Sequence, residues 1–226
     1  MNDLDFFLFY ALIDLMIFLD RTKFNSLDDR QRVTLINSLI GVKAANMIGT
    51  QSLSNQANLS LVSSVFHLGA SPAMMGFVIR PDSVQRDTIS NLRELPYLTV
   101  NHVNSDIVEN AHQTSARYSA EDSEFDKCNL TKEYLHDHPA PYVKESKIKF
   151  SAKMLREVDI PENGTHIIIC EILGIHLEQS SLGKDFFIDI TKAGSLGVSG
   201  LDQYLDIKAI GRLSYAKPDK VLKWLK

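Results

Sequence analysis

Residues 148–177 read IKFSAKMLREVDIPENGTHIIICEILGIHL, and this stretch decides the fold. Two runs within it, 148–158 and 166–177, are long and rich in apolar and β-branched residues. The residues between them include Pro161, Asn163 and Gly164, which are common in tight turns. This pattern predicts two long strands joined as a β-hairpin, and hence an antiparallel pair.

Shorter apolar runs before the hairpin predict further strands. They are separated by turn-rich segments and cover residues 44–50, 59–68, 73–80 and 97–103. A doubly wound sheet is the alternative, but the gaps near Ser52 and Ser71 are too short to hold its crossover helices. The sequence therefore predicts a mainly β chain, built as an antiparallel barrel with peripheral helices.

Helices are expected at three places beside these strands. Ser26 is a plausible N-cap, and the acidic residues after it predict a helix that runs to about Leu39 and ends before Gly41. Residues 87–95 have helical character, and Pro96 closes that helix. The Lys-rich residues 217–226 predict a short exposed helix at the end of the sequence.

Two other segments need separate treatment. Residues 112–141 are polar and have no clear period, which predicts a long excursion outside the barrel wall. Residues 4–19 are very apolar, but Asp14 lies among them and no Lys or Arg precedes them, so they predict a buried helix rather than a secretion signal or a membrane span. We expect residues 1–31 to form an N-terminal helical extension and residues 32–226 to form one domain with a C-terminal extension.

Composition limits the possible partners. The 24 basic and 28 acidic residues give a net charge of −4 at pH 7, and the basic residues are scattered, so nucleic acid is not an expected partner. Cys128 and Cys170 have no metal-ligand spacing, and no metal site is expected. Cys170 lies in an apolar run and is expected to be a buried, inert thiol. Such cysteine usage fits a reducing cytoplasm.

Two polar stretches could hold a ligand. In Asn58 to Phe66, small hydroxyl residues would let the backbone approach a flat ligand, although an ordinary strand with serines on its solvent face has the same pattern. In the stretch from Arg80 to Thr88, Arg80, Ser83 and the start of a helix could bind a phosphate. An N-cap turn with exposed arginines is the alternative there.

Two later stretches carry weaker signals. His112 could transfer a proton or contact the edge of a cofactor, whereas a solvated loop histidine is the simpler interpretation. The residues around it predict no Ser/His/Asp triad. Gly200 to Tyr204 and Arg212 to Pro218 indicate only a loop, a turn and a tail when taken alone.

In their combination and order, these stretches resemble the flavin reductase-like, FMN-binding split-barrel family. The resemblance extends from about Arg32 to Pro218, while the first twenty or so residues match nothing in it. The segments that carry it are Leu35–Leu39 with Gly41 and Lys43, Met47–Thr50, Asn58–His67, Ser71–Pro72, Gly76–Pro81, Arg86–Leu92, Val100–His102, Ala111–Ala116, Ser123–Phe125, Gly200–Tyr204 and Tyr215–Pro218.

The resemblance implies a Greek-key split barrel that forms a homodimer, with one FMN per subunit in a groove near the dimer interface. It places the strand from Asn58 to Ser64 along the isoalloxazine ring, and a phosphate group at the stretch that begins with Arg80. The cofactor-binding residues that it implies are Asn58, Ser60, Leu61, Val62, Ser63, Ser64, Arg80, Ser83, Asp87, Thr88 and Asn101, and His112 is the candidate catalytic residue.

Three functions are compatible with this resemblance. In the first, NADH or NADPH reduces the bound FMN, which passes electrons to an acceptor. In the second, the protein is a flavoredoxin-like electron carrier, and in the third it is a non-catalytic FMN-binding module. No GxGxxG motif follows a predicted strand, so NAD(P)H would stack transiently on the flavin instead of occupying a domain of its own.

Overall fold

The computed structural model of the chain describes residues 16–81, 86–119 and 121–225. Most of the helix predicted for residues 4–19 lies outside this range. The part that is described, residues 16–19, is exposed and not helical. Ser83, a predicted phosphate-binding residue, also lies outside the described residues.

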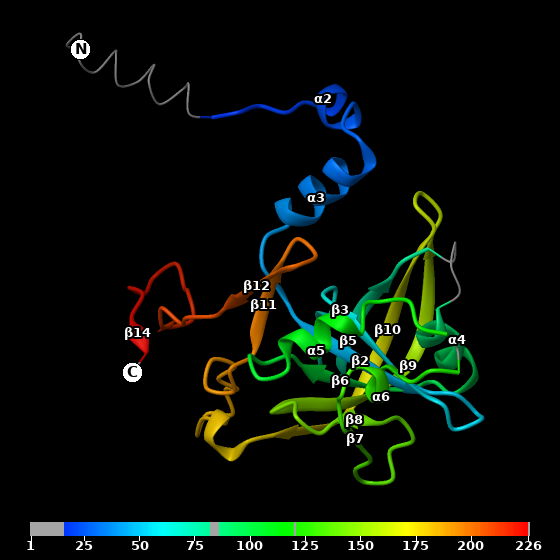
Figure 1. Cartoon of the computed structure of the whole chain (residues 1–226). Coiled ribbons are helices and arrows are strands. Elements are labelled where there is room, and N and C mark those ends of the chain that lie inside the picture. The colour runs from blue at the N-terminus through cyan, green and yellow to red at the C-terminus, as the bar shows by residue number, and fades with distance from the viewer. Residues whose placement is uncertain (1–15, 82–85, 120, 226) are drawn as a thin grey trace, which may run out of the picture.

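Seven antiparallel strands form the main sheet, in the order β3-β2-β6-β9-β10-β5-β4, and curl into a barrel with helices at its periphery (Figure 1). The predicted mainly β split barrel is thereby confirmed. The strands are β2 (Asn46–Gln51), β3 (Ala57–Val62), β4 (Phe66–Ala70), β5 (Ala73–Ile79), β6 (Tyr97–His102), β9 (Ile148–Ile160) and β10 (Thr165–Leu177).

The predicted hairpin is the longest pairing in the barrel. β9 and β10 pair from Thr165 opposite Ile160 to Leu177 opposite Ile148. Gly164 ends the turn with a φ of +70°, a conformation that glycine adopts without the steric cost of a Cβ atom. The turn chemistry of the sequence thus fixes the register of the two central strands.

The single strand predicted at residues 59–68 is wrong, because β3 and β4 are separated at Ser63 to Val65. Ser64 explains the break. Its hydroxyl donates to the carbonyl of Val78 at 3.1 Å and accepts from the Val78 N–H at 3.0 Å, so a side chain replaces one rung of the β4–β5 ladder. At this point the chain leaves β2 and joins β5. We call the connection, residues Ser63 to Val65, the seam, and it joins the two edge strands β3 and β4 of the barrel.

Alternation along the strands divides the core into two clusters. Met47 belongs to a cluster outside the barrel, whereas Ile48, its neighbour on β2, belongs to the interior cluster with Phe77 and Ile168. Cys170 is also buried in the interior cluster, and burial raises its pKa to about 12. The predicted burial of this thiol is confirmed, and a raised pKa disfavours the reactive thiolate.

Shorter elements surround the barrel. Their bounds are α2 (Arg21–Asn25), α3 (Asp29–Leu39), β1 (Lys43–Ala44), α4 (Asp87–Glu94), α5 (Val108–Gln113), α6 (Glu124–Lys127), β7 (Lys132–Glu133), β8 (Tyr142–Val143), the 3₁₀ helix η1 (Gln179–Ser181), β11 (Leu196–Ser199), β12 (Gln203–Asp206), β13 (Arg212–Leu213) and β14 (Trp224–Leu225). The predicted excursion at residues 112–141 is therefore more ordered than expected, since α6 packs against β3 and β7 pairs with β8.

Two expectations about the helices need correction. The N-cap of α3 is Asp28, which forms a capping box with Gln31, while Ser26 ends α2. The helix predicted at residues 217–226 is wrong, because β14 pairs there with β13, Leu213 lying opposite Trp224. The proposed domain boundary at residue 32 falls inside α3.

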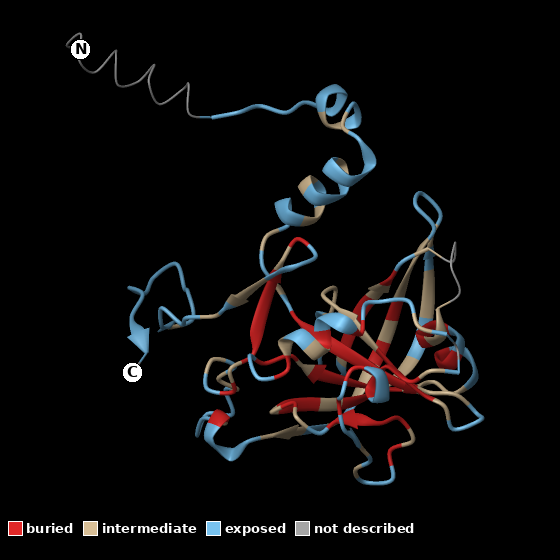
Figure 2. Ribbon diagram, in the orientation of Figure 1, coloured by how far each residue is buried: buried red, intermediate tan, exposed pale blue. Residues whose placement is uncertain are grey.

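Two segments extend from the barrel, and we call residues 16–42 the N-terminal arm and residues 207–225 the C-terminal arm (Figure 2). No described residue of either arm is buried. Many of their apolar side chains are exposed, among them Met16, Ile17, Phe18, Val33, Ile36, Leu39, Ile40, Val42, Ile210, Leu213, Tyr215, Val221, Leu222, Trp224 and Leu225. In the described part of the chain, no helix is long and apolar enough to cross a membrane.

Candidate functional site

The stretch predicted to lie along a flat ligand forms β3 and the seam. β3 is an edge strand of the sheet, and the N–H of Leu59 donates to the carboxylate of Glu124 at 3.0 Å instead of to β2. Backbone groups of an antiparallel strand alternate in direction, so the N–H and C=O of Leu61 also point away from β2. The outer edge of β3 therefore offers backbone donors and acceptors beside Glu124.

Glu124 supports this strand edge from α6. The residue is buried, at 9% relative exposure. Burial raises the pKa of its carboxyl group, the bond from Leu59 lowers it, and the negative charges of Asp87 and Asp122 raise it. In the sequence analysis, Glu124 was only one residue of the segment Ser123–Phe125 that carries the family resemblance. Its contact with Leu59, 65 positions away, could not be predicted from the sequence.

A cluster of hydroxyl and amide groups joins β3 to the start of α4. Ser60 Oγ lies 3.0 Å from Thr88 Oγ1, and Asn58 Nδ2 donates to Thr88 Oγ1 at 3.1 Å. Asn58 Nδ2 also donates to Thr50 Oγ1 at 3.2 Å, as does Asn91 Nδ2 at 3.2 Å. The predicted ring-binding strand and the predicted phosphate-binding helix are thereby held together.

The start of α4 carries the groups that suit an anion. No side chain of a described residue caps this helix at Arg86, so its first N–H groups have no side-chain acceptor there. Such groups, together with the helix dipole, favour a negative charge. Arg80, exposed at the end of β5, makes no ion pair with any described residue, whereas Asp87 adds a carboxylate to the first turn of the helix.

Three predicted cofactor residues have different surroundings from the rest. Ser64 uses its hydroxyl in the seam, while its neighbour Ser63 is half-buried. Asn101 has no exposed surface, because its Nδ2 donates to Met47 O at 3.2 Å and to Thr99 Oγ1 at 2.9 Å, and its Oδ1 accepts from the N–H of Val143 at 2.9 Å. Asn101 therefore holds β8 on the barrel and does not belong to the candidate site.

His112 lies at the end of α5 and is paired with a residue of the C-terminal part. Its Nδ1 lies 2.9 Å from the hydroxyl of Tyr204, and the two rings meet edge to face with centroids 5.7 Å apart. Ala111, the neighbour of His112, packs in the outer cluster with Leu61 and Tyr204. The structure thus brings together β3, the His112 stretch and the Gly200 to Tyr204 stretch, which lie far apart in sequence.

One group of metal-ligand type occurs among the described residues. Glu157 and Asp159 of β9 lie beside His166 of β10, with His166 Nδ1 3.0 Å from Glu157 and 2.9 Å from Asp159. Arg93 donates to both oxygens of Glu157, at 3.0 Å and 2.6 Å. Both oxygens of Glu157 are thereby engaged in a bidentate ion pair with Arg93.

The site thus combines an open strand edge, a helix start that no described side chain caps, and an imidazole paired with a phenol. The first can bind the polar edge of a planar ring, the second an anionic group, and the third can hold a proton. Asn58, Ser60, Leu61, Val62, Ser63, Asp87 and Thr88 lie on β3, the seam and α4, with Arg80 at the end of β5.

The flavin reductase-like domain model matches residues 43–189, and the chain therefore belongs to the flavin reductase-like family. An uncharacterized protein of Aquifex aeolicus (strain VF5) is 30% identical over 132 residues. That match covers 58% of this chain and 65% of the relative, slightly less than two thirds of the relative's length.

Solved structures share the fold. A protein from Shewanella frigidimarina NCIMB 400, described as a flavin reductase with a split-barrel domain, is 44% identical with a TM-score of 0.86, and the match covers 89% of this chain and 100% of that one. Flavoredoxin of Desulfovibrio vulgaris (Miyazaki F) is 18% identical with a TM-score of 0.64, over 79% of this chain and 92% of that one. The second likeness concerns the fold alone.

Proposed function

We propose that the protein is an FMN-dependent oxidoreductase that takes electrons from NADH or NADPH and works as a homodimer. The observation that carries this proposal is the hydrogen-bonded contact between Ser60 on β3 and Thr88 at the start of α4. It places an open strand edge next to the start of α4, where no side chain of a described residue caps the helix. FMN consists of a planar ring joined by a short chain to a phosphate. Its ring would bind at the strand edge, and its phosphate at the helix start.

The residues of the site fit FMN in charge and in hydrogen bonding. Arg80 is a forked cation at the end of β5, and it would pair with the phosphate beside the first N–H groups of α4. Either hydroxyl of the Ser60–Thr88 pair can be the donor, so the other is free to donate to the ligand. Asp87 can only accept hydrogen bonds when ionised, and this suits a ribityl hydroxyl better than the phosphate.

Bound FMN would supply the redox chemistry by accepting a hydride and releasing electrons. The chain's own residues position it. The backbone of Leu61 would contact the polar edge of the ring, and Glu124 would keep that backbone in place by bonding to Leu59.

We assign proton transfer at the site to His112. Its Nδ1 bond to the Tyr204 hydroxyl fixes the ring, and the side chain stays exposed. A fixed imidazole with one nitrogen toward solvent can pass a proton between water and a bound ligand. Tyr204 is the positioning residue in this arrangement.

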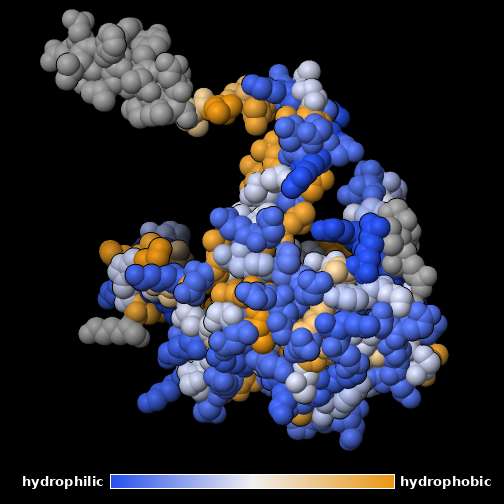
Figure 3. Space-filling view, in the orientation of Figure 1, coloured by the Kyte–Doolittle hydropathy of each residue, from blue (hydrophilic) through white to orange (hydrophobic). Residues whose placement is uncertain are grey.

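The two arms support the homodimer. Figure 3 shows apolar surface along the N-terminal arm and on the C-terminal arm, which in a monomer would lie in water. Patches of this kind mark interaction sites, and two-fold pairing is the commonest arrangement of like chains. We propose that each chain covers the arms of the other. Both cysteines are free and buried, which supports the proposed reducing, cytoplasmic location.

An absorbance spectrum recorded anaerobically tests the function. The purified protein should show bound flavin that is released as FMN on denaturation, and adding NADH or NADPH should bleach it. Protein that is colourless and does not bind added FMN would contradict the proposal. If FMN is bound but neither nucleotide reduces it, a flavoredoxin-like carrier becomes the better assignment, in keeping with the shared fold.

The variant Arg80→Ala tests the phosphate contact. Loss of one charge-assisted bond should weaken FMN binding by about 1.5 to 3 kcal/mol, while riboflavin, which has no phosphate, should bind as before. Titrations followed by flavin fluorescence give both constants. Equal losses for the two ligands would place Arg80 outside the phosphate site.

A further inference from the structure

A pocket of about 640 Å³ lies on the face of β9 and β10 that is turned away from the barrel core, and no predicted flavin-site residue lines it. Its walls come from the start of β6, the loop of residues 135–139, β8, and the halves of β9 and β10 far from their turn. A pocket of this size can hold a small organic molecule. The position is independent of the proposed flavin site.

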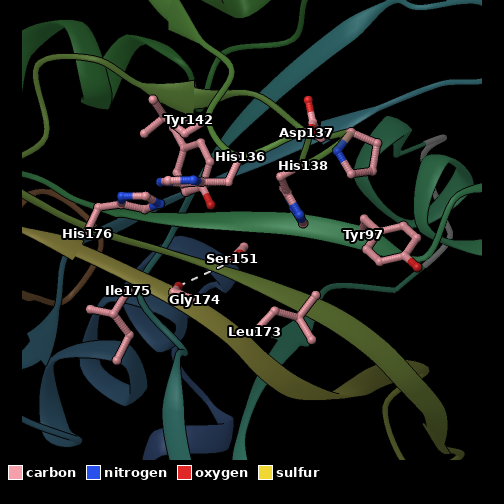
Figure 4. A pocket seen from close by; sticks show the side chains of 12 residues that line it. Tyr97, His136, Asp137, His138, Tyr142, Ser151, Leu173, Gly174, Ile175 and His176 are labelled. Carbon is pink, nitrogen blue, oxygen red and sulfur yellow. Dashed lines mark hydrogen bonds between the residues drawn. The ribbon is translucent and has the colours of Figure 1, made fainter.

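Aromatic rings form much of the wall (Figure 4). His136 and His176 are stacked with centroids 5.1 Å apart, and Tyr142 meets His176 edge to face at 5.2 Å. At the other end, Tyr97 meets His138 edge to face at 5.7 Å. Leu173 and Ile175 add apolar surface and are about half exposed, at 49% and 54%. These walls suit a planar aromatic body.

His138 gives the pocket a defined hydrogen-bond acceptor. Its Nε2 lies 3.1 Å from the carbonyl of Leu98, and because a carbonyl can only accept, Nε2 carries the proton. Burial lowers the pKa of His138, which favours the neutral ring, and no described residue donates a hydrogen bond to its Nδ1. The side chain is only 9% exposed and points into the pocket (Figure 4).

The loop that holds these rings is strained. His136 and Asp137 are consecutive non-glycine residues with φ values of +52° and +56°, in the left-handed region that such residues rarely adopt. The loop is nonetheless fixed, since His138 bonds to Leu98 and Thr99 Oγ1 donates to the Pro141 carbonyl at 2.6 Å. Strain that the surrounding structure maintains is typical of ligand sites.

Charge selects the kind of ligand. Among the described residues that line the pocket, Asp137 is the one with a carboxylate, and none is a lysine or arginine. Burial first, then His136 and Lys149, lower the pKa of His176, which favours its neutral imidazole as well. A phosphate or carboxylate would therefore find no lysine or arginine in the lining itself; the Lys153 ammonium lies at one end of the pocket, 5.7 Å from the centroid of the Tyr97 ring.

We propose that this pocket binds an uncharged planar aromatic molecule that carries an N–H or O–H donor, with His138 Nδ1 as the acceptor and the His136–His176 pair as a stacking wall. Indole is a suitable probe, because it has one ring system and one N–H. The N-methylated analogue 1-methylindole lacks the donor, and indole-3-carboxylate adds a negative charge. Both should bind more weakly, 1-methylindole by about 5-fold for one lost hydrogen bond.

Binding is measured by calorimetry on the full chain with saturating FMN, which keeps the probe from the flavin site. In parallel, the imidazole ¹⁵N signals are followed by NMR. Indole should shift the signals of His136, His138 and His176 and leave those of His67 and His112 unchanged. Absence of shifts in the three pocket histidines, or a change in flavin absorbance alone, would overturn the proposal.

The variant His136→Asn removes the stacking ring without disturbing the loop, because asparagine adopts the left-handed conformation more readily than histidine. It should weaken indole binding by about 3- to 10-fold, as expected for one aromatic contact. Leu155→Ala, an exposed change on β9 outside the pocket, is the matched control and should leave binding unchanged. Equal effects of the two variants would also overturn the proposal.

Discussion

The barrel and the two arms use apolar residues in opposite ways. Phe77, Leu59 and Ile168 have no exposed surface, whereas Trp224 is 62% and Ile210 94% exposed. Burial stabilises by about 25 cal/mol per Å² of apolar surface, so the barrel side chains contribute to folding and the arm side chains contribute little within one chain. The difference indicates that the stability of one chain resides in the barrel, and the exposed arms are where the proposed homodimer would form its contacts.

The largest effect should distinguish the two regions directly. Phe77→Ala leaves a cavity inside the barrel and should lower the free energy of unfolding by about 3 to 5 kcal/mol. Trp224→Ala should change it by less than about 0.5 kcal/mol, as surface substitutions do, at concentrations where the protein is monomeric. Urea unfolding measures the free energy of unfolding of both variants. Comparable losses would contradict the proposed difference between the barrel and the arms.

The arms should show their effect on assembly. A charge placed at the exposed indole position, Trp224→Asp, should weaken the dimer by about 2 to 4 kcal/mol if this residue is a central contact. Sedimentation equilibrium gives the dissociation constant. Lys208→Ala, an exposed polar change in the same arm, serves as the control. A dimer that is unchanged by Trp224→Asp would place the interface elsewhere.

The seam allows a comparison between neighbouring serines. Ser64→Ala leaves the N–H and C=O of Val78 without their partner and should cost about 1 to 3 kcal/mol of stability. Ser63→Ala removes an equivalent hydroxyl group. This hydroxyl is half-buried and has no hydrogen bond to a described residue, so the change in stability should be close to zero. Thermal unfolding of the two variants side by side is sufficient, and equal losses would contradict the role given to Ser64.

The smallest effect is a dependence on pH. Burial raises the pKa of Glu124, so this group favours the folded state when protonated, and its contribution is lost as the pH rises through the folded pKa. Glu124→Gln keeps an acceptor for Leu59 without the charge. The stability of the variant relative to the natural protein should therefore increase from pH 4 to pH 7. A difference that is constant over this range would show that the carboxyl is not perturbed.

Local signals in the sequence predicted most of the barrel. The hairpin of β9 and β10 depends on strand composition and on a turn that ends in Gly164, all within one stretch of chain. The break between β3 and β4 could not be predicted, because Ser64 bonds to Val78 on another strand. The helix predicted at residues 217–226 was wrong for a similar reason, because Trp224 and Leu225 of β14 pair with Leu213 and Arg212 of β13.

The candidate site was predicted in part. Ser60 and Thr88 were named from separate stretches, and the structure joins them. Glu124 was not predicted as a support, because its partner lies 65 positions away. Asn101 was assigned to the cofactor on resemblance, but side chains alternate along β6 and this one faces a covered side of the sheet.

The seam at Ser64 also bears on aggregation. An open seven-stranded sheet would present β3 and β4 as two unpaired edges, which recruit strands from other chains. Here one continuous stretch of chain forms both edges and joins them, and Glu124 occupies the outward N–H of Leu59. The outward N–H of Leu59 is then no longer available to a foreign strand, and the part of β3 that stays open is the part proposed to receive the flavin.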